Sequence, residues 1–184
     1  RENFFQYMAG QMSQLERKSI EPIALNVESA KVRAMQHFLS DIAWEEERIR
    51  FRYHGMVSED LGDAEGVLIF DESGFVKKGN DSVGVSRQYC GNVGKVENCQ
   101  VGVYTAYASR HGYGFLDNRL FIPEKWFGED YAERRKKCRL PAEISFKTKP
   151  RLAVEMLEKI VGEGVIPFRY VAADSVYGNS PEFL

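Results

Sequence analysis

The chain has 184 residues, of which 43% are hydrophobic, 12% aromatic and 28% charged. This composition is typical of a globular protein, and it excludes disordered, collagen-like and fibrous architectures. The length predicts one domain, or one domain with a small appendage. No run approaches the roughly 18 apolar residues of a membrane span, and Arg1-Glu2-Asn3 does not open a secretory signal. Three cysteines without a CxxC motif favour a reduced, cytoplasmic setting.

Positive charge is concentrated in one stretch of a chain whose net charge is −2. Residues 131–151 carry 8 basic and 2 acidic side chains, which gives a local net charge of +6. Such a concentration is typical of a surface that contacts phosphate groups. A solvated helix face is the alternative interpretation of the same run.

The two ends of the chain favour a piece of a longer protein. Position 1 is not methionine, and residues 179–182 resemble the start of a helix. In that interpretation Ser180 is the N-cap and Pro181 the first helical residue. We therefore expect the protein to continue beyond Leu184.

Helical periodicity dominates the first third of the chain. Apolar residues recur at helical spacing over residues 3–18, over 32–42 after Ser29 as an N-cap, and over 49–61. No strand pattern precedes residue 66. We therefore expect an N-terminal helical region over residues 1–65.

Strand patterns begin at residue 66. Residues 67–70 form a short apolar run that ends at Asp71, and a glycine-rich loop is expected over 79–94. Residues 99–108 and 113–122 are predicted to form a hairpin, 149–161 a helix and 168–173 a strand. A helix between two strands implies a parallel crossover. The prediction for residues 66–184 is an α/β domain with the order β-β-β-α-β.

Two aspartates, Asp71 and Asp174, each follow an apolar strand. A turn or cap residue is the alternative for either one alone. If the two strands are parallel neighbours, both carboxylates lie at the carboxyl edge of the sheet, where α/β folds place ligand sites. Oxygen ligands suit Mg²⁺ or Mn²⁺, and paired metal ions so held promote phosphodiester chemistry. The three histidines have no ligand spacing, and Gly91-Asn92-Val93-Gly94-Lys95 does not complete a phosphate-binding loop.

The sequence resembles bacterial insertion-sequence transposases of the DDE superfamily. Four segments carry the resemblance: LERKSIEP (15–22), GVLIFDESGFVKKG (66–79), SVGVSRQYCGNVGKVENCQVGVYTAYAS (82–109) and VAADSVYG (171–178). The resemblance implies a ribonuclease-H-like fold, with Asp71 and Asp174 as the first two acidic residues of the catalytic triad. The family's third residue, a glutamate on a later helix, has no counterpart here. Glu72, Asp81 and Glu182 are the nearest acidic residues, and none stands in the family's context.

The resemblance also implies an activity and its partners. The expected fold is a ribonuclease-H-like mixed sheet, incomplete at its C-terminus, preceded by a small all-helical segment. The expected activity is metal-dependent DNA cleavage and strand transfer at insertion-sequence ends, with Mg²⁺ or Mn²⁺ held by Asp71 and Asp174. The complete protein is expected to bind transposon ends and target DNA at the bacterial nucleoid, as a homodimer. The alternatives are an inactive remnant that binds DNA without cutting it and a stand-alone ribonuclease-H-like nuclease.

Eight basic residues are candidates for contacts with DNA phosphates, because lysine and arginine supply most of the salt-dependent affinity for DNA. Four follow the first predicted strand and four lie in the basic run: Lys77, Lys78, Arg87, Lys95, Arg134, Arg135, Lys136 and Lys137.

Overall fold

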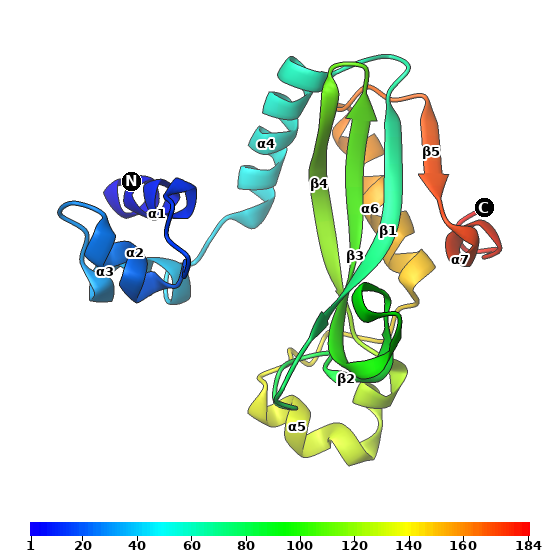
Figure 1. The fold of residues 1–184 in the computed structure, drawn as a ribbon. Coiled ribbons are helices and arrows are strands. Elements are labelled where there is room, and N and C mark those ends of the chain that lie inside the picture. Colours follow the sequence, from blue (N-terminus) through cyan, green and yellow to red (C-terminus); the bar gives the residue numbers. More distant parts are fainter. The chain divides into compact units, whose positions relative to one another are not determined.

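The structure, a computed structural model, describes residues 1–184 throughout. The chain divides into two compact units, Arg1–Glu46 and Glu47–Leu184 (Figure 1). All elements before Val67 are helical, as the sequence predicts. None of the helices combines the length and the apolar character that crossing a membrane requires.

Three short helices form the first unit: α1 (Glu2–Met12), α2 (Ile20–Asn26) and α3 (Val32–Ser40). Their core contains the buried side chains of Ile23, Ala24 and Met35. Helix α1 meets α2 at Gly10, where an added Cβ atom would lie 2.1 Å from Cγ2 of Ile23. A side chain at position 10 would therefore force the two helices apart.

A five-stranded mixed sheet forms the centre of the second unit (Figure 1). Its strands are β1 (Val67–Val76), β2 (Ser86–Cys90), β3 (Lys95–Ser109), β4 (Gly112–Phe121) and β5 (Tyr170–Ala173). Strand β3 pairs antiparallel with β1 on one side and with β2 and β4 on the other. Strand β1 pairs parallel with β5 on its other side. This mixed sheet, preceded by helices, confirms the predicted fold class.

Four helices accompany the sheet: α4 (Glu46–Leu61), α5 (Ala132–Lys137), α6 (Lys149–Glu163) and the single turn α7 (Ser175–Gly178). Helix α6 forms where the sequence predicts it. The Thr148 hydroxyl caps it by accepting from the Arg151 amide, and Gly164 ends it with a left-handed φ of 62°. Two 3₁₀ turns, Glu124–Phe127 and Glu129–Tyr131, lead from β4 into α5.

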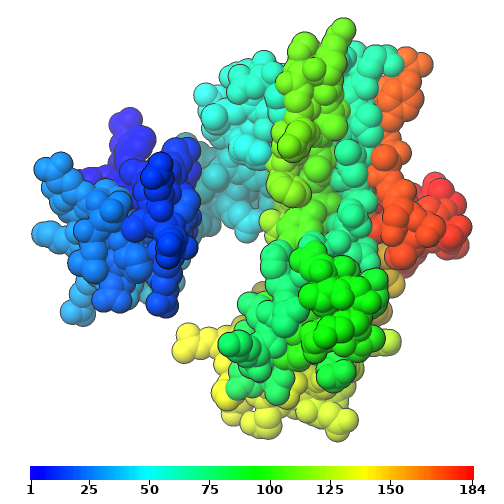
Figure 2. Space-filling view, in the orientation of Figure 1, coloured from blue at the N-terminus to red at the C-terminus, as the bar shows by residue number.

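The main core lies between one face of the sheet and helices α4 and α6. It includes Leu68 and Phe70 from β1, and Met156 and Ile160 from the apolar stripe of α6. Side chains alternate between the two faces of a strand, so Ile69 and Asp71 lie on the opposite face and are exposed. In Figure 2, atoms of β1, β4 and β5 lie at the visible surface of the second unit. The sheet thus has one covered face and one face that bears Asp71.

Helix α4 is held to this core by a buried histidine. His54 is fully buried; its Nδ1 lies 2.6 Å from Oε2 of Glu163 on α6, and its Nε2 lies 3.2 Å from the Leu116 carbonyl oxygen on β4. Strand β4 bulges at this point, because its pairing with β3 shifts between Thr105 and Ala106. The bulge frees the Leu116 carbonyl for the histidine.

Three expectations about local structure are wrong. Strand β1 does not end at Asp71 but continues to Val76, because its pairing with β3 extends that far. The glycine-rich stretch 79–94 is not all loop, since it contains β2, which pairs with the start of β3. Ser29 does not cap α3: its φ of 62° is left-handed, and the N-cap is Lys31. Long-range pairing with β3 explains the extent of β1 and the presence of β2. The left-handed conformation of Ser29 explains why it is not the N-cap of α3.

Residues beyond α7 form a turn instead of the helix expected from Ser180 and Pro181. The amides of Phe183 and Leu184 both donate to the Ser180 carbonyl. The Phe183 ring packs edge-on against Phe70 and Tyr177, which joins the turn to the main core.

Candidate active site

Asp71 and Asp174 are neighbours at the point where β5 ends, with Asp71 inside β1 and Asp174 directly after β5. The parallel register pairs Phe70 on β1 with Ala173 on β5, so the next residue on each strand is an aspartate. Neighbouring strands lie about 4.8 Å apart. Asp174 keeps an extended backbone, with φ of −76° and ψ of −178°, so it continues the line of β5. Both aspartates are exposed.

Each aspartate uses one carboxylate oxygen for a local hydrogen bond. Oδ1 of Asp71 accepts from the Glu72 amide at 2.8 Å. Oδ1 of Asp174 accepts from the Val176 amide at 2.9 Å and so caps α7. Neither aspartate forms an ion pair with a lysine or arginine, and the second oxygen of each, Oδ2, accepts no hydrogen bond from the protein. Two anionic oxygens are therefore available where β5 ends beside β1.

A partly buried polar cluster lies beside the two aspartates. The hydroxyl of Tyr177, whose side chain is fully buried, donates to Oε2 of Glu72 at 2.7 Å. The ammonium of Lys149, at the start of α6, lies 2.6 Å from Oε1 of the same carboxylate. Burial, the hydrogen bond to Glu72 and the negative charges of Glu72, Asp71 and Asp174 raise the pKa of the Tyr177 hydroxyl well above its usual value. The hydroxyl therefore stays protonated and remains a donor.

The three other acidic residues considered from sequence are engaged elsewhere. Both oxygens of Glu72 have partners, Asp81 pairs with Lys137 at 2.5 Å, and Glu182 accepts from the Thr148 hydroxyl. No group of three or more histidine, cysteine, aspartate or glutamate side chains comes together to hold a metal ion. The site thus offers two carboxylates.

Two carboxylates with available oxygens fit a divalent cation. Mg²⁺ prefers oxygen ligands and is often held by only one or two carboxylates, with water and substrate phosphates as its other ligands. The donor set of Asp71 and Asp174 matches this preference. Closely spaced carboxylates repel each other, and a bound cation relieves that repulsion.

Four of the basic residues considered as DNA contacts lie on or after strands β1, β2 and β3, three of them at the far end of the sheet. Strand β1 continues past Asp71 to Val76, so Lys77 and Lys78 follow Asp71 by six and seven residues. At about 3.3 Å per residue, this places them roughly 20 Å from the aspartate. Arg87 on β2 is exposed at the same end. Lys95 on β3 is exposed too, but it follows the turn Gly91–Val93, in which Asn92 contacts Ser73 and Gly74 of β1, and it pairs with Glu97 at 3.2 Å. The structure does not bring these four side chains next to the aspartates.

The other four basic residues lie on α5 and have different surroundings. Arg135 donates from Nη1 to the carbonyl oxygens of Trp126 and Gly128, at 2.6 and 2.7 Å, so it holds the preceding turn. Lys137 pairs with Asp81. Arg134 stacks over the Tyr131 ring at 4.8 Å, and Lys136 is exposed. Arg134 and Lys136 make no ion pair with a carboxylate.

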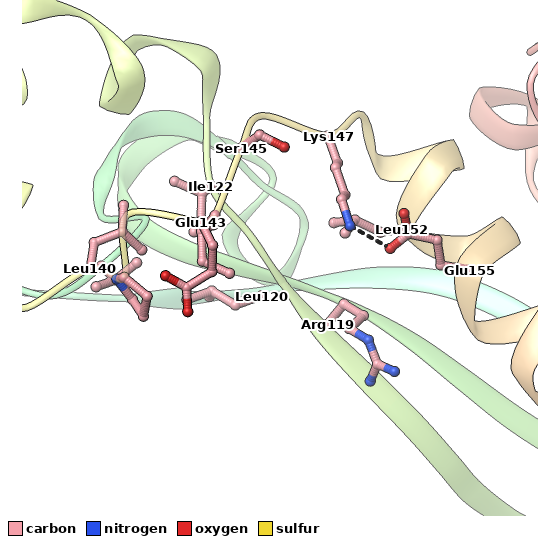
Figure 3. A pocket seen from close by; sticks show the side chains of 12 residues that line it. Arg119, Leu120, Ile122, Leu140, Glu143, Ser145, Lys147, Leu152 and Glu155 are labelled. Carbon is pink, nitrogen blue, oxygen red and sulfur yellow. Dashed lines mark hydrogen bonds and ion pairs between the residues drawn. The ribbon is translucent and has the colours of Figure 1, made fainter. Parts of the chain in front are cut away.

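A separate pocket of about 570 Å³ lies between β4, the start of α6 and residues 140–147 (Figure 3). Its lining includes the aliphatic side chains of Leu120, Ile122 and Leu140 and the ion pair between Lys147 and Glu155 at 2.8 Å. Neither Asp71 nor Asp174 lines it. This pocket is therefore distinct from the aspartate site.

Comparison with known proteins identifies the family. A family model described as "DDE superfamily endonuclease" matches residues 1–184. The chain belongs to the DDE superfamily endonucleases. It is 35% identical over 177 residues to a protein of Microchaete diplosiphon named "Probable transposase for insertion sequence element IS701". The match covers 96% of this chain and 43% of that relative. No solved structure matches the chain.

Family membership confirms the resemblance found in the sequence. In this DDE superfamily endonuclease, the sequence predicts that Asp71 and Asp174 share a site if their strands are parallel neighbours, but it does not predict the polar cluster of Glu72, Lys149 and Tyr177. In the sequence, Glu72 stands out only as an acidic residue near Asp71 outside the family's context, and Lys149 only as part of the basic run. The sequence holds one signal for this cluster, which is proximity to the two aspartates. Glu72 directly follows Asp71, and Tyr177 comes three residues after Asp174.

Proposed function

We propose that this chain supplies two metal-binding carboxylates, Asp71 and Asp174, to a transposase that cuts DNA at insertion-sequence ends and joins the cut strand to target DNA. Family membership supports the reaction class. The observation that carries the proposal is the register of β1 and β5, which makes the two aspartates neighbours.

In this proposal the two aspartates act by binding divalent metal ions. Each contributes an oxygen that no protein group occupies, and their backbones are fixed by the β1–β5 pairing and the α7 cap. Mg²⁺ or Mn²⁺ bound there would supply an activated hydroxyl and stabilise the leaving oxygen of the phosphodiester. The exposure of both aspartates leaves room for a DNA strand.

DNA is the proposed partner, as transposon ends and as target. The α5 residues Arg134 and Lys136 are available for phosphate contacts, Lys77, Lys78 and Arg87 form a second basic group at the far end of the sheet, and Lys95 follows the turn that packs against Ser73 and Gly74. A duplex spans 20 Å in about six base pairs, at 3.4 Å per pair. One bound duplex can therefore reach both the aspartates and the far end of the sheet. We further propose action at the bacterial nucleoid and a homodimeric complete protein.

DNA binding without cleavage is a second candidate function. The observation that favours it is the engagement of Glu72, Asp81 and Glu182 by other side chains, which leaves two carboxylates at the site. Each further anion would strengthen attraction to a divalent cation. A site with two carboxylates is therefore expected to hold metal more weakly than one with three.

A cleavage assay separates the two candidates. End-labelled duplexes that tile the DNA flanking the coding sequence are incubated with the protein in Mn²⁺, in Mg²⁺ or in EDTA. The transposase proposal predicts specific strand cuts in either metal and none in EDTA. Retarded but uncut duplexes would favour the second candidate, and cuts in EDTA would contradict metal dependence.

The basic residues of α5 predict a salt-dependent affinity. Substituting Arg134 and Lys136 with alanine is expected to reduce the slope of log affinity against log salt by about 0.9 for each lost contact with duplex phosphate. The slope is measured by fluorescence anisotropy between 50 and 200 mM salt. Lys159→Ala, a lysine of α6 that pairs with Glu47, is the control. A slope equal to that of the unsubstituted protein would exclude α5 from DNA binding.

A further inference from the structure

We propose that Tyr177, Glu72 and Lys149 are positioning residues that set the separation of Asp71 and Asp174 for metal binding. This inference rests on the proposed function of the two aspartates. We call the three side chains the Glu72 clamp.

The Glu72 clamp joins three elements through one carboxylate. Oε2 of Glu72 on β1 accepts from the Tyr177 hydroxyl of α7 at 2.7 Å, and Oε1 pairs with the Lys149 ammonium of α6 at 2.6 Å. Glu72 and Lys149 are about four-fifths buried, at 21% and 22% side-chain exposure. The Lys149 ammonium also lies over the Phe121 ring, 5.6 Å from its centroid. Charge-assisted hydrogen bonds in partly buried surroundings are stronger than neutral ones on the surface.

The clamp lies next to both aspartates but on the other side of the sheet. Glu72 directly follows Asp71, and alternation along β1 directs the two side chains to opposite faces. Tyr177 lies on the turn that Asp174 caps. A hydrogen bond from Tyr177 to Glu72 therefore fixes α7 against β1, and with it the backbone of Asp174 against that of Asp71.

The β5 strand itself is weakly restrained, because all four of its residues are exposed and it pairs with β1 alone. The turn after it is held by packing of Phe183 on Phe70 and Tyr177 and by a hydrogen bond from Thr148 to Glu182. At the opposite end, Tyr170 and Arg169 contact Glu65, at 3.3 and 2.7 Å. At the aspartate end, the Tyr177 hydroxyl makes the side-chain hydrogen bond that links α7 to β1. Loss of this bond is expected to widen the range of separations between the two carboxylates, and so to weaken any ligand that needs both.

The test measures Mn²⁺ binding to the protein by electron paramagnetic resonance, together with its thermal unfolding. Tyr177→Phe removes only the hydroxyl and keeps the buried ring, and it is expected to weaken Mn²⁺ binding about three- to tenfold. Tyr170→Phe removes a hydroxyl at the other end of the same strand and is expected to leave Mn²⁺ affinity unchanged. Glu72→Gln keeps an acceptor for Tyr177 and is expected to lose less affinity than Glu72→Ala.

The outcomes separate this inference from the proposed function. Asp71→Asn should remove Mn²⁺ binding; if it does so while Tyr177→Phe binds as tightly as the unsubstituted protein, the positioning role is refuted and the metal site stands. Equal losses of affinity in Tyr177→Phe and Tyr170→Phe, tracking a lower unfolding temperature, would also refute it, because that pattern reflects stability alone. Absent Mn²⁺ binding by the unsubstituted protein, or binding unaffected by Asp71→Asn, would overturn both proposals.

Discussion

Replacing Asp71 or Asp174 with asparagine is expected to abolish metal-dependent strand cleavage and to leave DNA affinity nearly unchanged. Asparagine keeps the shape of the side chain but removes the negative charge that attracts a divalent cation. Substituting a residue that only supports a metal ligand already costs about 10- to 100-fold in metal affinity or activity. Loss of a ligand itself should therefore reduce the cleavage rate by about 100-fold or more. The cleavage rate and the DNA affinity are measured on the same end-labelled duplex in Mn²⁺.

Glu158→Gln is the matched control for these two substitutions. Glu158 is an exposed carboxylate of α6, 60% exposed and 3.6 Å from Arg151, and it takes no part in the aspartate site. Its substitution should leave both cleavage and binding at the level of the unsubstituted protein. Cleavage by Asp71→Asn or Asp174→Asn at the same rate as this control would refute the assignment of the two aspartates.

Replacing Met156 with alanine is expected to reduce the free energy of unfolding by about 2–5 kcal/mol. Met156 is fully buried between α6 and the sheet, and its sulfur accepts from the Thr105 hydroxyl at 3.4 Å. The substitution leaves a cavity in the main core and deprives a buried hydroxyl of its partner. Urea unfolding followed by far-ultraviolet circular dichroism measures the change.

The control for this substitution lies on the exposed face of the same helix. Glu158→Ala changes the helix at a position outside the core and is expected to alter the free energy of unfolding by less than about 0.5 kcal/mol. If Met156→Ala were as mild as Glu158→Ala, α6 could not be packed against the sheet as described.

Periodicity and strand chemistry were sufficient to predict most of the second unit. The apolar spacing of Leu152, Met156 and Ile160 predicted α6, and the run Phe168–Ala173 predicted a strand that ends at Asp174. Helix α6 stands between β4 and β5 in the chain and predicted that these two strands run parallel, which the pairings through β1 and β3 confirm. The pairing of β5 with β1, which makes Asp71 and Asp174 neighbours, was a condition in the sequence analysis, and the structure supplies it.

Long-range pairing explains what local patterns missed. Residues 71–76 contain turn-forming Asp, Ser and Gly, yet they are strand because β3 offers ten consecutive partners to β1. Ser86–Cys90 form β2 for the same reason, within a stretch rich in glycine. Strand formation depends on such partners more than on intrinsic preference. No local signal could have shown that Lys149 and Tyr177 meet at Glu72, since 77 and 105 residues separate them from it.

The basic run illustrates a further limit of sequence patterns. Its four consecutive basic residues share one helix, but Arg135 holds backbone carbonyls and Lys137 pairs with Asp81. A local charge count treats all four alike. The structure shows that two of them have partners within the protein, which leaves Arg134 and Lys136 as the sharper candidates for DNA contacts.

The most direct test of the metal site is to locate Mn²⁺ on the protein by nuclear magnetic resonance. Mn²⁺ broadens the amide signals of nearby residues, so titration of the ¹⁵N-labelled protein maps where the ion binds. We predict that the amides of residues 70–73 and 173–177 broaden first, and that Asp71→Asn removes this effect. Broadening that begins elsewhere, for example around Asp81 and Asp130 near α5, would contradict a metal site formed by Asp71 and Asp174.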